Sequence, residues 1–262
     1  MTAIAHPIKI SVITAVFNRV ATIEDALTSV QSQTWPDVEH VVIDGASKDG
    51  TLAILRAQRN RISVLISEPD AGIYDALNKG LSHVTGDVVG LMHSDDFFAD
   101  DRVLDRVAAA FADPEVDGVY ADLDYVAKDD PHRVIRRWRS GQYNPTKLGW
   151  GWMPPHPTLY LRRSVIEKWG GFDDTFRISA DYDAMLRYLA KGKIRLTYIP
   201  EVLVRMRVGG ESNRSMMHIL RKSCEDYRAL RKNGVGSLGA LLWKNVSKLG
   251  QFMGAKRRDQ NA

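Results

Sequence analysis

Short apolar runs alternate with stretches of helical spacing over the first 120 residues of the chain. Four β-branched apolar runs have the length of buried strands: 8–16, 38–43, 62–66 and 87–92. Between them, apolar residues recur on one helix face in three segments: 21–33, 49–58 and 73–84. Strands that alternate with helices at this spacing indicate an α/β fold, with a mostly parallel sheet covered by helices on both faces.

The pattern becomes less regular in the second half of the chain. A helix is predicted over 102–111 and a strand over 116–120, whereas 122–161 has less periodicity and is interpreted as strands and loops. The later periodic segments predict a helix, two strands and a second helix: 181–190, 194–198, 202–208 and 216–232. The second helix is followed by Asn233-Gly234, a typical stop signal.

Positive charge is concentrated near the C-terminus. The chain is 44% apolar and 26% charged, with a net charge of +4, which is ordinary for a globular protein. Residues 214–262 carry 11 Lys/Arg and 3 Asp/Glu, while the preceding 213 residues carry 25 and 29. Segment 238–253 has an apolar helical stripe, and three basic residues follow it. We expect 238–258 to meet an anionic membrane surface; the alternative is a helix docked on the protein's own core or on a second subunit.

Cysteine content and hydrophobicity bear on location. Cys224 is the only cysteine, so no internal disulfide is possible and a reducing compartment is expected. Residues 1–9 lack the apolar segment of a signal peptide. No apolar run approaches the ~18 residues that span a bilayer. The sequence therefore predicts a protein that is cytoplasmic or peripheral on the inner face of the cell membrane.

Acidic residues follow three of the predicted strands. Asp44 follows the second strand, Asp70 the third, and Asp95-Asp96 the fourth. The carboxyl ends of parallel strands meet at one edge of the sheet, where ligands bind. Two adjacent carboxylates repel each other, and a hard divalent cation would relieve this repulsion and bridge a diphosphate. The pair alone does not decide between a metal site and the start of the next helix, where capping carboxylates are also common.

Four motifs in order resemble family 2 glycosyltransferases: SVITAVFNR at 11–19, VIDGASKDGT at 42–51, SEPDAGIYDALNKG at 67–80 and SDD at 94–96. The resemblance covers about residues 8–210. It implies a GT-A glycosyltransferase domain over 1–212, with a nucleotide-binding part (8–121) and an acceptor-side part (122–212). Residues 213–262 would form a basic, helical extension.

The resemblance also implies roles for residues of the donor site. Phe17 and Asn18 would line the nucleotide, and Asp44 would accept a hydrogen bond from the base. Asp95 would lie beside the ribose or a water on the metal. Asp96 would bind the metal, Mn²⁺ or Mg²⁺, directly. Two further residues would lie near the nucleotide or its phosphates: Asp70 and Lys79, although a lysine on a helix is more often solvated.

The segment ISADYDAMLR at 178–187 resembles the family's segment around its catalytic Asp, which would make Asp181 the base. An acceptor oxygen must lose its proton as it attacks, and a positioned carboxylate contributes roughly 10²–10⁴-fold to such a step. The frequent Glu-Asp form is changed here, because Ala180 replaces the Glu. The alternative is that Ser179 or Asp181 caps the helix.

Aromatic and basic residues are further candidates. Trp150, Trp152 and His156 lie in a loop that suits an acceptor sugar, although Trp residues more often pack than bind. Arg205, Arg207 and the segment 209–212 occupy the stretch where relatives close over the donor diphosphate; the alternative is a solvated strand face. His93 has no partner at ligand spacing and is interpreted as structural.

The predicted function is therefore inverting transfer of one sugar from a nucleotide-sugar, with UDP favoured by family habit, to an acceptor hydroxyl. We expect the acceptor to be a lipid-linked saccharide of cell-surface polysaccharide synthesis. Two alternatives are an inactive nucleotide-sugar-binding or partner subunit and a sugar nucleotidyltransferase. The latter needs a Gly-rich loop after the first strand, and 17–20 contains no glycine. A nucleic-acid-binding role is not favoured, because the only aromatic residues of the basic segment 238–258, Trp243 and Phe252, fit its apolar stripe or the edge of that stripe.

Overall fold

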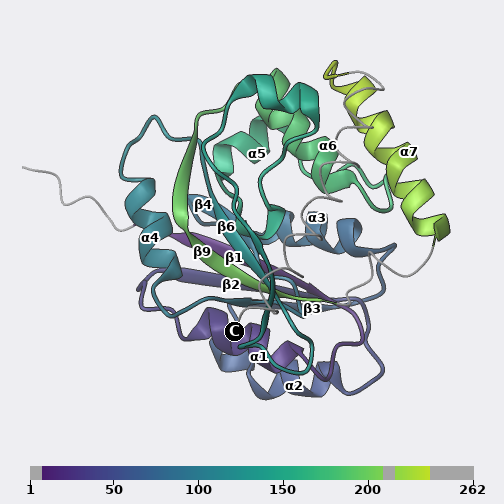
Figure 1. Ribbon diagram of the computed structural model, residues 1–262. Helices are drawn as coiled ribbons and strands as arrows, with labels where there is room; N and C mark the ends of the chain where they lie inside the picture. Colours follow the sequence, from purple (N-terminus) through teal and green to yellow (C-terminus); the bar gives the residue numbers. More distant parts are fainter. Residues whose placement is uncertain (1–7, 209–215, 237–262) are drawn as a thin grey trace, which may run out of the picture.

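The computed structural model describes residues 8–208 and 216–236 (Figure 1). In the described chain, nine strands form one sheet in the order β3-β2-β1-β4-β8-β6-β9-β5, and β7 pairs with β6. The first half alternates strands and helices: β1 (Ile10–Val16), α1 (Ile23–Gln31), β2 (Val38–Asp44), α2 (Thr51–Ala57), β3 (Val64–Ser67), α3 (Ile73–His83) and β4 (Val88–Leu91). These four strands are parallel, which confirms the predicted α/β fold.

Helices cover both faces of this sheet, and β1 is therefore buried on both sides. Val12 belongs to a core with α1 and α4 (Val103–Ala110), and Ile13 belongs to a core with α3. Figure 1 shows α1 and α2 on one side of the sheet and α3 on the other. Helix α3 lies close to β1, since a Cβ at Gly80 would come within 2.5 Å of the Ile13 side chain. This close packing brings the start of α3 to the carboxyl end of β1.

The second half adds mixed strands and short helices. After β5 (Phe97–Phe98) and α4 come β6 (Gly118–Val126), β7 (Val134–Trp138), two 3₁₀ turns η2 (Pro145–Trp150) and η3 (His156–Thr158), β8 (Tyr160–Arg162), α5 (Arg163–Trp169), α6 (Ala180–Leu186), the π-turn η4 (Arg187–Lys191) and β9 (Leu196–Arg207). Strand β8 pairs antiparallel with both β4 and β6, and so joins the two halves.

Three features of this half differ from the sequence prediction. The two strands predicted at 194–198 and 202–208 are one strand, β9, because a register shift opposite Ala121 and Asp122 accommodates Pro200 and Glu201. Helix α5 falls just beyond a segment of weak periodicity and has only seven residues, too few for a clear helical pattern. The predicted helix at 181–190 is shorter, because it changes to a π-turn at Arg187.

Helix α7 (Met216–Lys232) has the predicted bounds. It packs on α6, and Ala229 and Leu230 are buried in the same core as Leu186 and Tyr188 (Figure 1). The predicted helix at 238–253, the basic residues at 256–258 and the segment 209–212 lie outside the described residues. No helix in the described part of the chain combines the length and the apolar character needed to cross a bilayer.

Candidate active site

A cavity of about 310 Å³ opens where β1 and β4 end and α6 begins. Charged and polar side chains line it, among them Arg19, His93, Asp95, Asp96, His156 and Asp181. The structure therefore brings the predicted metal ligand and the predicted base to one cavity from opposite halves of the chain. The inner wall is apolar and lies between α3 and α6, with Leu77, Leu81 and Met185 among its residues.

Asp96 is almost completely buried at the floor of this cavity, with 1% of its surface exposed. Its Oδ1 accepts a hydrogen bond from the backbone N–H of Arg207 at 3.2 Å, while its buried Oδ2 has no hydrogen-bond partner in the described structure. Burial, and next the charge of Asp95, raise the pKa of Asp96 well above its usual range. An ionised Asp96 therefore requires added positive charge beside it.

Arg207 fixes the backbone of the Asp pair. Its guanidinium donates to the carbonyl oxygen of Asp95 at 3.0 Å and pairs with Asp25 of α1 at 2.5 Å. It also lies over the ring of Phe97, 4.8 Å from the centroid. Arg207 was predicted as a possible diphosphate ligand; the structure shows it engaged in joining β9, α1 and the Asp95-Asp96 turn.

The loops after β1 and β2 are tied together through Asn18. Its backbone N–H donates to Ser47 Oγ at 2.8 Å, and its Oδ1 accepts from the Lys48 N–H at 2.8 Å. Asn18 has a φ of 50°, a left-handed conformation that asparagine tolerates better than most residues. Phe17, by contrast, exposes 54% of its surface, so its ring is free to contact a ligand.

Asp44 and Asp70 occupy neighbouring loops. Asp44 is fully buried and accepts hydrogen bonds from Ser67 Oγ at 2.6 Å and the Ser47 N–H at 3.2 Å, so its present partners are protein groups. Asp70 lies over Gly45, where a Cβ would come within 2.3 Å of the Asp70 carboxylate and 3.3 Å of the Phe17 ring. Glycine at position 45 thus leaves room for both Phe17 and Asp70, and neither of these residues lines the cavity.

Lys79 does not reach the cavity. Its ammonium pairs with Glu68 at 2.9 Å and Asp75 at 3.4 Å, and it donates to the carbonyl oxygen of Pro69. The hydrogen bond with Glu68, the main cause, raises the pKa of Lys79. Two arginines line the cavity instead, Arg177 and Arg19. Neither was predicted as a site residue, although the first sequence motif contains Arg19. Its place three residues after the end of β1 is the signal that was available.

Asp181 lies in the first turn of α6, with its carboxylate turned to the cavity. Tyr74 Oη is 3.2 Å from Oδ1 and donates to the carbonyl oxygen of Ile178 at 2.6 Å. His156 Nδ1 is 3.3 Å from Oδ2. Burial, and then the charge of Asp181, raise the pKa of Tyr74 above its usual range, so the hydroxyl keeps its proton. Neither Tyr74 nor His93 was predicted as a site residue.

The three predicted acceptor residues are separated. His156 lines the cavity, whereas Trp152 packs edge-on against Tyr120 and stacks on Tyr143, with centroid distances of 5.7 and 5.4 Å. The Trp152 Nε1–H donates to the carbonyl oxygen of Ser140 at 3.3 Å. Trp150 exposes 61% of its surface and does not line the cavity.

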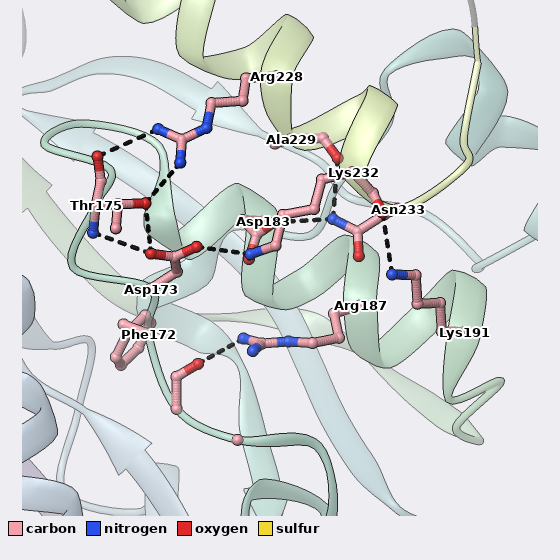
Figure 2. Close-up of polar contacts among 12 residues, drawn as sticks. Phe172, Asp173, Thr175, Asp183, Arg187, Lys191, Arg228, Ala229, Lys232 and Asn233 are labelled. Carbon is pink, nitrogen blue, oxygen red and sulfur yellow. Dashed lines mark hydrogen bonds and ion pairs between the residues drawn. The ribbon is translucent and has the colours of Figure 1, made fainter.

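Helix α7 packs on α6, and Figure 2 shows the polar contacts at the C-terminal end of α7. The fully buried Asp183 accepts from Lys232 at 3.0 Å and from Asn233 at 2.9 Å. At the other end of the contact, Glu225 accepts hydrogen bonds from the backbone N–H groups that precede α6, those of residues 177–179. Asp183 is therefore part of the packing between α6 and α7 and does not line the cavity.

Sequence comparisons identify relatives over most of the chain. The model of the family described as "Glycosyl transferase family 2" matches residues 11–172. An uncharacterized glycosyltransferase of Mycobacterium tuberculosis (strain CDC 1551) is 32% identical over 187 residues, 68% of each chain. A PGL/p-HBAD biosynthesis glycosyltransferase of Mycobacterium bovis (strain BCG) is 28% identical over 212 residues, 78% of each chain.

Solved structures show the same fold at lower identity. The mannosyltransferase PcManGT of Pyrobaculum calidifontis, in complex with GDP-Man and Mn²⁺, has a TM-score of 0.67 and 21% identity over 97% of this chain and 74% of its own. S. aureus TarS 1-349 with UDP-GlcNAc has a TM-score of 0.66 and 20% identity, over 86% of this chain and 65% of its own. The chain spans 43% of a longer TarS chain.

These structural neighbours are GT-A glycosyltransferases, which confirms the predicted fold class. The family model covers more than half of the chain, and the relatives named above are glycosyltransferases. The chain is a glycosyltransferase and belongs to glycosyl transferase family 2.

Proposed function

We propose that this glycosyltransferase transfers a single sugar, with inversion and with a divalent metal, from a nucleotide-sugar to an acceptor hydroxyl. We expect a UDP-sugar as donor and a lipid-linked saccharide of cell-surface polysaccharide synthesis as acceptor. The observation that carries the proposal is that Asp96 and Asp181, 85 residues apart in sequence, line one cavity. Binding of UDP-GlcNAc and GDP-Man by structural neighbours supports the donor class.

The residues around Asp96 fit a divalent cation. Its Oδ2 is a buried carboxylate oxygen without a partner, and Asp95 adds a second negative charge beside it. Among the described residues, no three His, Cys, Asp or Glu side chains are grouped to hold a metal by themselves. Asp96, with Asp95 beside it, would hold Mn²⁺ or Mg²⁺ together with donor phosphates. The metal, when bound, would neutralise charge on the leaving diphosphate.

Residues of the chain would divide the remaining tasks. Asp181 accepts the proton of the acceptor hydroxyl through Oδ2 or Oδ1. As this proton leaves, the acceptor oxygen bonds to the anomeric carbon, and the bond from that carbon to the diphosphate breaks. One carboxylate suffices for this single displacement. Phe17 and Asp70 flank the nucleotide and Arg19 faces its phosphates, while the contacts proposed for Asp44 and Lys79 require these side chains to leave their present partners.

The place of the reaction is part of the same proposal. We propose that the protein works in the cytoplasm at the inner face of the membrane, with 238–258 as the contact and 213–262 as an extension of the 1–212 transferase domain. The basic charge of the tail supports this arrangement. The apolar inner wall of the cavity between α3 and α6 supports an acceptor with an apolar portion.

The decisive experiment compares wild type with Asp181→Asn. We expect turnover of UDP-sugars to fall by roughly 10²-fold or more, the contribution of a lost general base. Donor binding in the presence of Mn²⁺ should be retained, because Asp96 is unchanged. Turnover is measured as nucleotide release, and binding by calorimetry.

The matched control is Asp174→Asn, since Asp174 is exposed and lies outside the cavity; its turnover should equal wild type. Wild-type turnover in Asp181→Asn would remove Asp181 from the mechanism. Donor binding by wild type without any transfer or hydrolysis, across UDP-, GDP- and dTDP-sugars, would instead favour an inactive binding subunit.

A further inference from the structure

Two histidines from distant segments form a chain that ends on the candidate base. His156 Nδ1 lies 3.3 Å from Asp181 Oδ2, and His156 Nε2 lies 2.8 Å from His93 Nε2. The two rings meet edge to face, with 4.9 Å between their centroids. His93 follows β4 and stands two residues before Asp95, so this chain connects the Asp95-Asp96 turn with the start of α6.

The backbone around His156 is rigid. Pro155 and Pro157 flank it and fix φ at two of three consecutive positions. The next residue, Thr158, is fully buried and holds η3 on β6, because its hydroxyl bonds with the Ala121 backbone on both the N–H and carbonyl sides. The His156 ring is therefore presented to Asp181 from a fixed support rather than from a mobile loop.

The contacts select one tautomer of His156. Burial lowers the pKa of His156 to about 4, so the ring is neutral near pH 7. A neutral ring carries one N–H, and the carboxylate beside Nδ1 favours the proton there. His156 Nε2 is then an acceptor, and His93 Nε2–H is its donor. One hydrogen bond thus joins the two rings, and the Nδ1–H of His156 is directed at Asp181 Oδ2.

We propose that His156 is a positioning residue, which orients the carboxylate of Asp181 through its Nδ1–H and is itself oriented by His93. The proposal rests on the proposed function, in which Asp181 is the base. Tyr74 contacts the other oxygen, Oδ1, at 3.2 Å. Oδ2 and Oδ1 thus have different neighbours, and the carboxylate plane is set before the acceptor binds. The sequence suggested an acceptor contact for His156; the geometry points to the base instead.

Three substitutions separate this role from others. His156→Asn places an amide N–H near the position of Nδ1 and keeps the contact with Asp181. His156→Gln places its amide near Nε2 and keeps only the contact with His93. His156→Leu keeps neither contact. We measure kcat, KM for donor and acceptor, and the thermal unfolding midpoint of each variant.

We expect kcat to fall about 10–100-fold in the Leu and Gln variants, because a misplaced catalytic group costs up to roughly 10²-fold. The Asn variant should stay within about threefold of wild type, and the KM values should change little. A purely structural role would lower the unfolding midpoint and kcat together in all three variants. Equal loss of kcat in the Asn and Gln variants, or an effect confined to acceptor KM, would overturn the proposal.

A measurement on the wild-type protein does not depend on the variants. ¹⁵N chemical shifts of the His156 ring should report a neutral imidazole protonated at Nδ1. An Nε2-protonated ring would overturn the proposal even if every variant failed to fold. The two proposals also fail separately: active Asp181→Asn removes the base, whereas inactive Asp181→Asn with fully active His156→Leu removes only the positioning role.

Discussion

At the scale of single residues, Asp96 is the group whose surroundings are least balanced. Its carboxylate is buried, borders Asp95 and lacks a partner on Oδ2. Burial raises its pKa first, and the charge of Asp95 adds to this. A carboxyl group with a raised pKa in the folded state destabilises the protein once pH exceeds the value in the unfolded chain. Without a cation beside it, an ionised Asp96 therefore lowers the stability of the folded protein near neutral pH.

Asp96→Asn should consequently separate stability from metal binding. Without metal, the amide removes a buried charge, and we expect the unfolding free energy at pH 7 to rise by about 1 kcal/mol, or roughly 2–4 °C. With Mn²⁺ and UDP, the wild type should be stabilised by mass action and the variant should not. Thermal unfolding of both proteins, with and without the ligands, measures this. An equal ligand-induced shift in Asp96→Asn would show that the metal does not bind there.

The sequence predicted the positions of some site residues better than their contacts. Asp95, Asp96 and Asp181 were predicted because each belongs to a motif at the end of a strand or the start of a helix, and all three line the cavity. The contacts of His93 with His156 and of Tyr74 with Ile178 join residues 63 and 104 positions apart. No local pattern contains such pairs, since they depend on how β4, η3 and α3 come together. Lys79 shows the reverse case, a motif residue whose charge is taken up by its own helix and loop.

At the scale of elements, the start of α6 depends on α7. Three backbone N–H groups in residues 177–179 point to the carboxylate of Glu225, at distances of 3.1, 2.8 and 3.1 Å to Oε2. The Ser179 hydroxyl donates to Asp226 at 2.7 Å. Helix starts carry unsatisfied N–H groups that favour an anion. Here the anion comes from another helix, α7, and the residue before Asp181 is the small, uncharged Ala180.

Glu225→Ala should therefore loosen the start of α6. We expect a loss of about 1–2 kcal/mol in unfolding free energy, comparable to the loss of a helix cap, and a lower kcat because Asp181 is two residues from the capped segment. Urea unfolding and turnover measure the two effects. Arg221→Ala, at an exposed position of the same helix, should change stability by less than about 0.5 kcal/mol. Equal effects of the two substitutions would contradict a capping role for Glu225.

Elements with strong periodicity were predicted well, and those defined by tertiary contacts were not. The bounds 216–232 for α7 follow from helical spacing and from Asn233-Gly234. Strand β5, only Phe97–Phe98, exists because it pairs with Val204 and Arg205 of β9, a partner that local sequence does not reveal. The uninterrupted β9 likewise depends on pairing with β6, which carries the strand past Pro200.

At the scale of the whole molecule, the sheet contains buried groups that are sensitive to acid. His40 on β2 is 3% exposed and contacts Thr14 Oγ1 at 3.0 Å; burial lowers its pKa to about 4. For the neighbouring Glu39, burial acts to raise the pKa, but hydrogen bonds from Ser11 and Thr85 outweigh it and lower the pKa to about 2. In both cases the unfolded chain binds protons at a higher pH than the folded chain does.

Stability should therefore fall in two overlapping steps on acidification. Between about pH 6.5 and 4 the unfolded state binds a proton at His40 that the folded state does not bind, and between about pH 4.5 and 2 the same holds for Glu39.

His40→Gln keeps a polar partner for Thr14 but cannot titrate. We expect it to reduce the slope of unfolding free energy in the upper range by about one proton, or roughly 1.4 kcal/mol per pH unit, and to leave the lower range unchanged. Urea unfolding from about pH 7.5 to about pH 2 measures both slopes. The reduction should be partial, because burial also lowers the pKa of His93 and His156. An upper slope identical to that of wild type would mean that His40 is protonated in the folded protein or neutral in the unfolded chain, and the buried sheet would then not be the source of acid sensitivity.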